Sequence, residues 1–236
     1  ALLIIISIFS LAKGSVYISN ADIWLAIFQK GEEINKTIIW ELRLPRLIAS
    51  LLVGSSLGMS GALLQGMLRN GLASPYLLGI SAGSGLVIVF FISFSLIQTF
   101  IPFAAWIGAI LTTLIVFVLS KDGNKIVVER LVLGGVAISS LFGAIQATLL
   151  LNAEDGRIQA ALNWLIGSLN ARGWQEIKFT ALPILIALFI GIFLYRQLNL
   201  LSLGDELSVS LGTSLFRSRC LIGAIATLLA ACAVSI

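Results

Sequence analysis

The stretch WELRLPRLIASLLVGSSLGMSGALLQGMLRNGLASPYLLGISAGSG, residues 40–85, decides the fold. After a charged entry it continues as an uncharged apolar run, Leu47–Leu68, which is long enough to cross a hydrocarbon core of about 30 Å as a helix. A polar segment, Arg69–Pro75, follows, and its proline ends any helix that reaches it. The next run is apolar again and opens with glycines and serines. The stretch therefore predicts two membrane-spanning helices joined by a short turn.

Small residues recur at every fourth position of the first run. They are Ser50, Gly54, Gly58, Ala62 and Gly66. This spacing aligns them along one ridge of a helix. Helices in lipid associate through close backbone packing, which small side chains permit. We expect this ridge to serve helix packing, and the lining of a conduit is the alternative. Similar ridges recur later at Gly135, Ser139, Gly143 and Ala147, and at Gly223, Thr227, Ala231 and Ser235.

The whole chain shares this apolar character. Of its 236 residues, 58% are hydrophobic and 11% are charged, whereas a soluble domain carries about 25% charged residues. The net charge is +4, but the basic residues lie between apolar runs, which favours contact with the lipid bilayer over a nucleic-acid partner. We expect a single transmembrane domain over residues 1–236, without a linker or a soluble domain.

Seven apolar runs predict an all-α, polytopic transmembrane bundle. They lie at 1–12, 47–68, 76–97, 103–120, 131–151, 179–195 and from 220 onward. The first run is too short to span a bilayer, and the last one stops at the chain end, so we expect both to be incomplete spans. Three shorter helices are predicted in the polar segments, at 21–29, at 158–165 and between Gly204 and Gly212.

The residue types present exclude most site chemistry. The sequence contains no histidine, and its two cysteines, Cys220 and Cys232, form no metal or redox spacing. No charged residue lies well inside a predicted span, which disfavours proton-coupled secondary transport and an intramembrane enzyme. A phosphate-binding P-loop is also absent. We therefore expect no catalytic residue, cofactor or metal site, and an energy source on another chain.

Charge does not decide the orientation in the membrane. If the segments 69–75, 121–130 and 196–219 share one side, seven basic residues lie there and eight lie on the other side. The positive-inside rule therefore gives no answer.

Residues 42–85 resemble the signature region of the FecCD-type permeases, the membrane subunits of binding-protein-dependent ABC importers for ferric siderophores, haem and cobalamin. Weaker matches follow at 131–140, 164–169 and 201–212, so the resemblance spans nearly the whole chain. It implies a permease of about ten spans in the bacterial inner membrane. Such a subunit would carry an iron(III)-siderophore or related metal chelate, driven by ATP hydrolysis on a partner.

The resemblance also implies partners: cytoplasmic ATP-binding subunits, an extracytoplasmic substrate-binding protein and a second permease copy. Arg43 and Arg46 match outer-face arginines that pair with acidic residues of the binding protein. Guanidinium groups hold carboxylates bidentately and steer docking, so the residue type suits the role. Snorkelling of both arginines to the interface is the alternative.

Two further sites are implied by the same resemblance. The helix that contacts the ATPase matches Gly204, Asp205, Glu206, Leu207, Leu211 and Gly212, and a solvated loop helix is the alternative. The helix that lines the pathway matches 131–151, with Gly134, Gly135, Ser139, Gln146 and Thr148 as the candidate residues.

The chain departs from the family pattern at two places. The family's turn R-N-P-L-A-[DE]-P is Arg69-Asn70-Gly71-Leu72-Ala73-Ser74-Pro75 here, with one proline and one acid replaced. The family's later motifs and last spans do not follow, so a fragment or a truncated product is expected. A truncated, non-transporting membrane scaffold is therefore the alternative function, and a secondary transporter is a weaker one.

Overall fold

The computed structural model describes residues 2–14, 16–97, 100–123, 125–170 and 173–236. Most of these residues are helical. The described ranges also contain one short antiparallel hairpin, β1–β2, between α6 and α7. The elements are α1 (Leu2–Ala12), α2 (Asn20–Ile27), α3 (Glu33–Thr37), η1 (Ile38–Arg43), α4 (Leu44–Leu68), η2 (Pro75–Leu78), α5 (Ile80–Ser93), α6 (Ile101–Leu119), β1 (Lys121–Asp122), β2 (Lys125–Ile126), α7 (Val128–Leu151), α8 (Asp155–Ile166), α9 (Trp174–Phe193), α10 (Tyr195–Ser202), α11 (Asp205–Ser210) and α12 (Leu215–Ser235).

Within the described residues, helices occupy most of each of the seven predicted apolar runs. Among the described residues, five helices are long and apolar enough to cross a membrane: the continuous helix Glu33–Leu68, α6, α7, α9 and α12. The other two runs form α1 and α5, which are apolar but shorter. The all-α membrane fold is therefore confirmed, and the short helices α2, α8 and α11 appear where short helices were predicted.

The first long helix begins at Glu33 and not at the predicted Leu47, because α3 runs through η1 into α4 without a break. η1 is π-helical, and the amide of Leu44 donates to the carbonyl of Ile39, five residues earlier. Pro45 follows immediately and has no amide hydrogen to give. The wider π turn accommodates this proline, as such turns do within α-helices. The helix therefore continues past a residue that normally ends one.

The predicted span 76–97 is divided into two helical pieces. The 3-10 turn η2 ends at Gly79, whose φ of 72° lies in the left-handed region that glycine adopts without a steric cost. Only then does α5 begin, and it ends at Ser93. A Cβ at Gly79 would lie 2.9 Å from Cγ2 of Thr112, so the close approach of α6 also requires glycine here.

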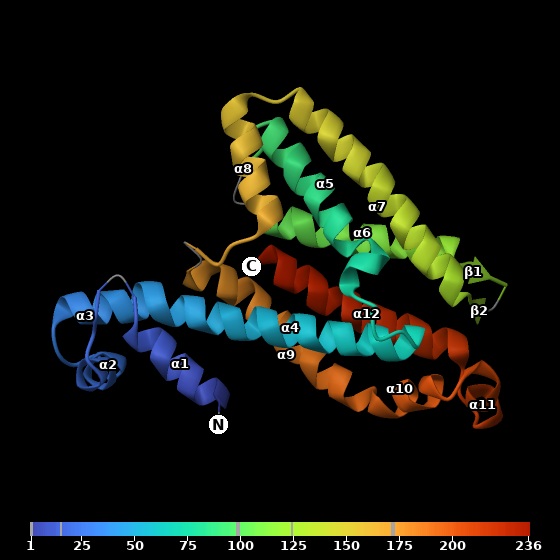
Figure 1. Cartoon of the computed structure of the whole chain (residues 1–236), viewed down its shortest axis with the longest axis horizontal. Helices are drawn as coiled ribbons and strands as arrows, with labels where there is room; N and C mark the ends of the chain where they lie inside the picture. Colours follow the sequence, from blue (N-terminus) through green and yellow to red (C-terminus); the bar gives the residue numbers. More distant parts are fainter. Residues whose placement is uncertain (1, 15, 98–99, 124, 171–172) are drawn as a thin grey trace.

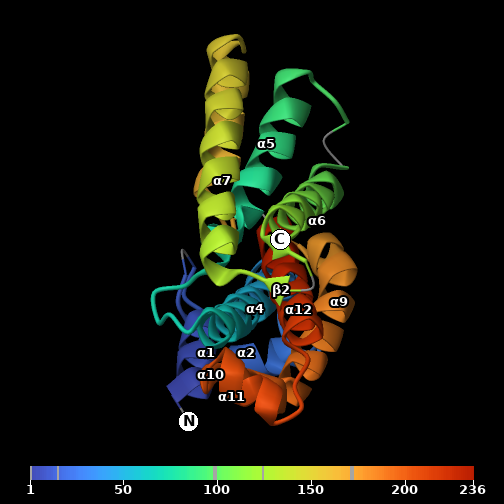
Figure 2. The same ribbon diagram turned by 90° about the vertical axis from the view of Figure 1, so that its right-hand side faces the viewer.

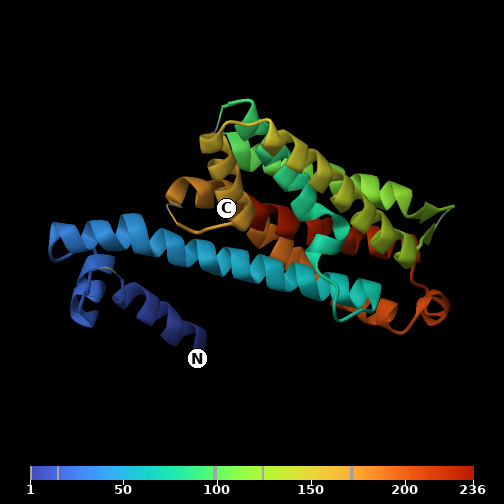
Figure 3. The same cartoon turned by 45° about the horizontal axis from the view of Figure 1, so that its top comes forward.

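The helices form two groups that meet at α12. Helices α4, α9 and α10 lie on one side, and α5, α6 and α7 lie on the other (Figure 2). α12 packs against α4 and α9 and also against α6, so it holds the groups together. The continuous helix α3–η1–α4 forms a long rod whose α3 end projects past the neighbouring helices (Figure 3).

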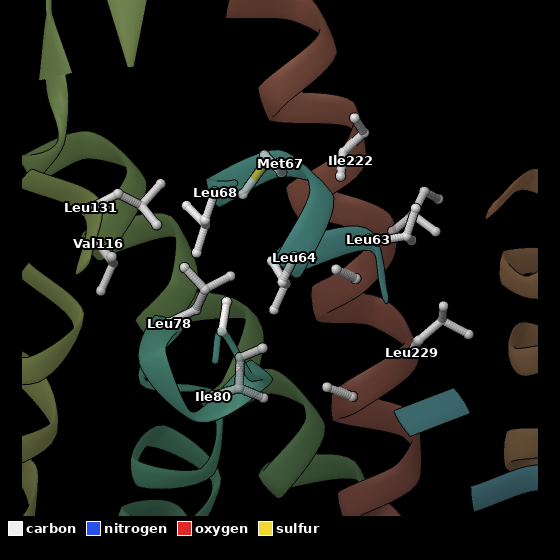
Figure 4. Close-up of a cluster of buried hydrophobic side chains, with 14 of the residues drawn as sticks. Leu63, Leu64, Met67, Leu68, Leu78, Ile80, Val116, Leu131, Ile222 and Leu229 are labelled. Carbon is white, nitrogen blue, oxygen red and sulfur yellow. The ribbon is translucent and has the colours of Figure 1, made fainter. Parts of the chain in front are cut away.

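The core lies where α4, α12 and the η2–α5 junction meet (Figure 4). Its labelled side chains are Leu63, Leu64, Met67, Leu68, Leu78, Ile80, Val116, Leu131, Ile222 and Leu229. The hydroxyl of Ser60 donates to the carbonyl of Ala226 at 2.7 Å, which ties α4 to α12 inside this apolar contact. The predicted ridge on α12, residues 223, 227, 231 and 235, is buried and serves packing as expected.

The ridge on α4 lies on the opposite face from that core. Ser50, Gly54, Gly58 and Ala62 are exposed, and no atom of the described chain lies within 4 Å of a Cβ built at either glycine. Gly66 differs, because a Cβ there would clash with Leu198 of α10. Helix packing through Ser50, Gly54, Gly58 and Ala62 therefore stays a prediction.

Candidate functional site

The connecting segments of the chain gather at two opposite ends of the bundle. The hairpin β1–β2 and α11 lie together at one end, and α2, α3 and α8 lie toward the other (Figure 1). We call the first of these the α11 end. The long helices run between the two ends, so a ligand or a displacement that crosses the bundle does so along them.

Helix α11 is tied to two other helices through the carboxylate of Asp205. Oδ1 of Asp205 accepts from Nη2 of Arg219 in α12 at 2.8 Å and from Nη2 of Arg69, which follows α4, at 3.3 Å. The buried hydroxyl of Ser208 donates to the carbonyl of Leu200 in α10 at 2.6 Å. These bonds hold a helix of six residues in one place.

The opposite side of α11 presents an apolar surface to its surroundings. Leu207 is 57% exposed and Leu211 is 59% exposed. Leu203 and Val209 are also exposed, and Glu206 is exposed beside them. We call these five residues the α11 patch. An exposed apolar group of this kind marks a contact with another molecule more often than an isolated leucine does.

The residues predicted from the sequence to contact the ATPase thus lie on different sides of α11. Asp205 points toward Arg219 and Arg69, while Glu206, Leu207 and Leu211 face outward. Gly204 and Gly212 flank the helix with φ values of 107° and 80°, conformations that a side chain would strain.

Arg219 was missed in the sequence, because the last span was expected to begin at Cys220. The structure begins α12 at Leu215, which places Arg219 inside the helix and 3% exposed. The spacing of the sequence carried one signal for this burial. Arg219 lies four positions after the apolar Leu215, so both residues lie on the same face of the helix, and both are buried.

Helix α7 has one packed face and one open face. On the packed face, a Cβ at Gly135 would lie 1.8 Å from the carbonyl oxygen of Leu77, and Gln146 donates to the carbonyl of Ala82 at 2.9 Å. Ser139 lies on this face too, where a Cβ at Gly79 would come within 3.5 Å of its Oγ. These three pathway candidates therefore pack against η2 and α5.

The other two pathway candidates lie elsewhere on α7. Gly134 approaches Val116 and Leu119 of α6, each 3.9 Å from a built Cβ, and Thr148 is exposed. Thr148 belongs to an open face that runs the length of the helix. Its other exposed residues from Leu133 onward are Leu133, Val136, Ala137, Ser140, Leu141, Gly143, Ala144, Ile145, Ala147 and Leu151. Which of these positions meets a translocated ligand stays a prediction.

The two arginines proposed for docking have different surroundings. Arg43 is half-buried, and its guanidinium donates to the carbonyls of Leu11, Ala12 and Val16, so it holds the end of α1. Arg46 is exposed, and the described residues offer it no ion pair. Arg46 is thus available to a partner, whereas Arg43 already caps a helix.

Replacement of each arginine by alanine is expected to separate these roles. Arg43→Ala removes the groups that bind the carbonyls at the end of α1, so it should lower thermal stability in detergent, by about 1–3 kcal/mol in free energy. Arg46→Ala should leave the melting temperature unchanged, since the side chain is exposed. Equal melting temperatures of both variants would contradict the structural role of Arg43.

Two indole groups donate hydrogen bonds between segments at the end of the bundle opposite the α11 end. Nε1 of Trp174 donates to the carbonyl of Trp40 at 2.8 Å, and Nε1 of Trp40 donates to the carbonyl of Ala26 at 3.0 Å. The two rings lie 6.3 Å apart between centroids. Tryptophan at this level is typical of the boundary between lipid and water.

A largely apolar cavity of about 880 Å³ opens between α6, α8, α9 and α12. Trp106, Phe179, Pro183 and Cys232 are among its lining residues. The described residues contain no group of three side chains suited to a metal ion. The cavity walls therefore offer mainly apolar contact.

Comparison with known proteins gives one consistent result. The FecCD transport family matches residues 2–236. The chain belongs to the FecCD transport family. The FecCD resemblance first noted in residues 42–85 is thereby confirmed over nearly the whole length, and this FecCD chain is a membrane transport subunit.

Relatives of this FecCD chain include two permeases of iron-chelate import systems. The iron(3+)-hydroxamate import system permease FhuG of Bacillus subtilis is 35% identical, over 98% of this chain and 71% of that protein. The ferric enterobactin transport system permease FepG of Escherichia coli is 33% identical, over 99% of this chain and 71% of that protein. A solved metal-chelate type ABC transporter in an inward-facing conformation superposes with a TM-score of 0.89 at 28% identity, covering 100% of this chain and 73% of that one.

Proposed function

We propose that this chain is the membrane-spanning permease subunit of a binding-protein-dependent ABC importer that carries an iron(III)-siderophore or related metal chelate across the bacterial inner membrane. The observation that carries the proposal is the similarity of the entire chain, in sequence and in fold, to permeases of this one transport class. A bulky chelate suits a bundle whose spanning helices are apolar and rich in small residues, since no bare ion has to be solvated there.

ATP-binding subunits dock at the α11 end, which is the cytoplasmic end in this proposal. The α11 patch supports this assignment, because its leucines are exposed although α11 itself is held firmly to α10 and α12. A firmly held helix with an apolar outer side can pass on a displacement that an ATPase imposes on it. ATP hydrolysis takes place on those subunits.

The substrate-binding protein docks at the opposite end. Arg46 supports this assignment as an exposed guanidinium, which can hold a carboxylate of the binding protein bidentately. Arg43 lies one turn away and contributes positive charge that steers association, while its hydrogen bonds keep α1 in place.

A second permease copy meets the open face of α7, and the pathway lies between the copies. The length of that open face supports this assignment. Its exposed residues from Leu133 onward are aliphatic, carry a hydroxyl or are glycine, which gives a chelate a surface that binds it weakly along its route. Transport proceeds by alternating access, in which ATP-driven closure of the ATPase pair tilts the long helices.

The proposal is tested by reconstitution of the permease with its ATPase and binding protein in proteoliposomes. We expect uptake of ⁵⁵Fe-labelled ferric hydroxamate or ferric catecholate that requires ATP and the binding protein. Stable co-purification with the ATPase but no uptake of any metal chelate would indicate the non-transporting scaffold. Uptake without ATP would indicate a secondary transporter.

A further inference from the structure

Arg219 lies where three separate segments of the chain meet. It belongs to the first turns of α12 and is 3% exposed. Nη2 donates to Oδ1 of Asp205 at 2.8 Å, and Nη1 donates to the carbonyl of Ile126 at 2.7 Å. One guanidinium therefore bonds two segments at once, and its rigid plane fixes the distance between them.

The two hydrogen-bond partners of Arg219 lie at the start of α11 and directly before α7. Asp205 is the first residue of α11, the helix that carries the α11 patch. Ile126 ends β2, and α7 begins only two residues later at Val128. The guanidinium thus joins the proposed ATPase contact to the strand that leads directly into the proposed pathway helix.

The hairpin is in turn fixed to the start of α7. Ile126 pairs with Lys121 across the hairpin, and the amide of Val127 donates to the carbonyl of Ser120 at 3.1 Å. Nη1 of Arg130, in the first turn of α7, lies 3.6 Å from Oδ1 of Asp122. A displacement of Ile126 is therefore carried into the first turn of α7 and is not absorbed by a loose loop.

Packing alone does not account for a charge at this position. A well-packed apolar side chain fills such a place without the desolvation cost of a buried guanidinium. The Nε of Arg219 is buried and has no hydrogen-bond partner among the described residues. The hydrogen bonds of Nη1 and Nη2 offset part of the burial cost, but Nε adds to it without a partner. Those two hydrogen bonds join α11 to the hairpin.

We propose that Arg219 is the positioning residue that transmits the movement of α11 to α7. This inference rests on the proposed function, in which α11 contacts the ATPase and α7 lines the pathway. When the ATPase moves α11, Asp205 draws the guanidinium with it, and the second bond moves Ile126 and the start of α7. Arg69 holds the same oxygen of Asp205 from α4, so the long helix follows the same movement.

The test uses the complete importer in proteoliposomes with ⁵⁵Fe-labelled ferric hydroxamate, and it measures uptake, ATP hydrolysis and thermal stability. Arg219→Lys keeps the charge but replaces the planar fork by a single ammonium group, which cannot hold both partners at their present spacing. We expect wild-type assembly and ATP hydrolysis with about tenfold less uptake per ATP hydrolysed. Arg217→Gln, an exposed neighbour in the same helix, is the matched control and should behave as wild type.

A second measurement follows the link itself. Spin labels at Ser210 in α11 and at Glu129 in the first turn of α7, both exposed, report the distance between the helices with and without a non-hydrolysable ATP analogue. We expect an ATP-dependent change in the wild type that shrinks in Arg219→Lys. Wild-type coupling and a wild-type distance change in that variant would overturn the role of Arg219, as would a loss of assembly and stability together. Absence of ATP-driven uptake in the wild type would instead overturn the proposed function.

Discussion

Replacement of Gly135 by alanine is expected to lower the stability of this permease by about 3 kcal/mol, because a side chain is forced into a backbone. A Cβ at this position would lie 1.8 Å from the carbonyl oxygen of Leu77 and 2.8 Å from its carbonyl carbon. Both atoms belong to the 3-10 turn η2, which the left-handed Gly79 anchors. The main chain of η2 must therefore move, and the junction between η2 and α5 must move with it.

The measurement is thermal unfolding in detergent, followed by the fraction of monodisperse protein. A loss of 3 kcal/mol corresponds to a fall in Tm of roughly 10 °C for a chain of this size. The matched control is Gly143→Ala on the same helix, where the described chain places no atom within 4 Å of the added methyl. Since alanine has the higher helix propensity, the control should be neutral or more stable by up to about 1 kcal/mol. Equal effects of the two substitutions would contradict the packing described for α7.

Replacement of Leu207 by aspartate is expected to reduce ATP-driven uptake by about tenfold or more, because an interface anchor of this size contributes about 2 kcal/mol. Leu207 is 57% exposed in the permease alone, so the substitution should leave its melting temperature unchanged. The aspartate would bury an unpaired carboxylate once the ATPase covers the α11 patch.

Co-purification with the ATPase and uptake in proteoliposomes measure this effect together. Leu207→Met keeps an apolar side chain of similar volume and serves as the control, with uptake close to wild type. Full ATPase binding and full uptake by Leu207→Asp would remove the α11 patch from the proposed interface.

Much of the fold follows from local sequence pattern. Uncharged apolar runs predict helices wherever they are long enough, and α6, α7 and α9 begin or end within a few residues of their predicted limits. The family was identifiable from residues 42–85 alone, because that stretch combines a charged entry, a small-residue ridge and a polar turn.

The sequence does not predict those features of the fold that depend on contacts with residues far away in the chain. The first long helix was expected to begin at Leu47, but the π turn η1 before Pro45 lets it begin earlier and continue into α4. The burial of Ser56 and Ser60, and not of the predicted ridge, follows from the position of α12, which comes far later in the chain. Arg219 was assigned to a loop because an arginine counts against a membrane span. Its partner Asp205 and the carbonyl of Ile126 make burial tolerable, and no local pattern reveals them.

The continuous helix from Glu33 to Leu68 is longer than the membrane it crosses. Its 36 residues span about 54 Å, against a hydrocarbon core of about 30 Å. Part of this helix therefore extends beyond the hydrocarbon core, and the helix can act as a rigid lever. A tilt of about 10° displaces one tip relative to the other by roughly 9 Å. Since Arg69 follows one tip and holds Asp205 at 3.3 Å, a small rotation forced at the α11 end becomes a large stroke on the far side of the bilayer.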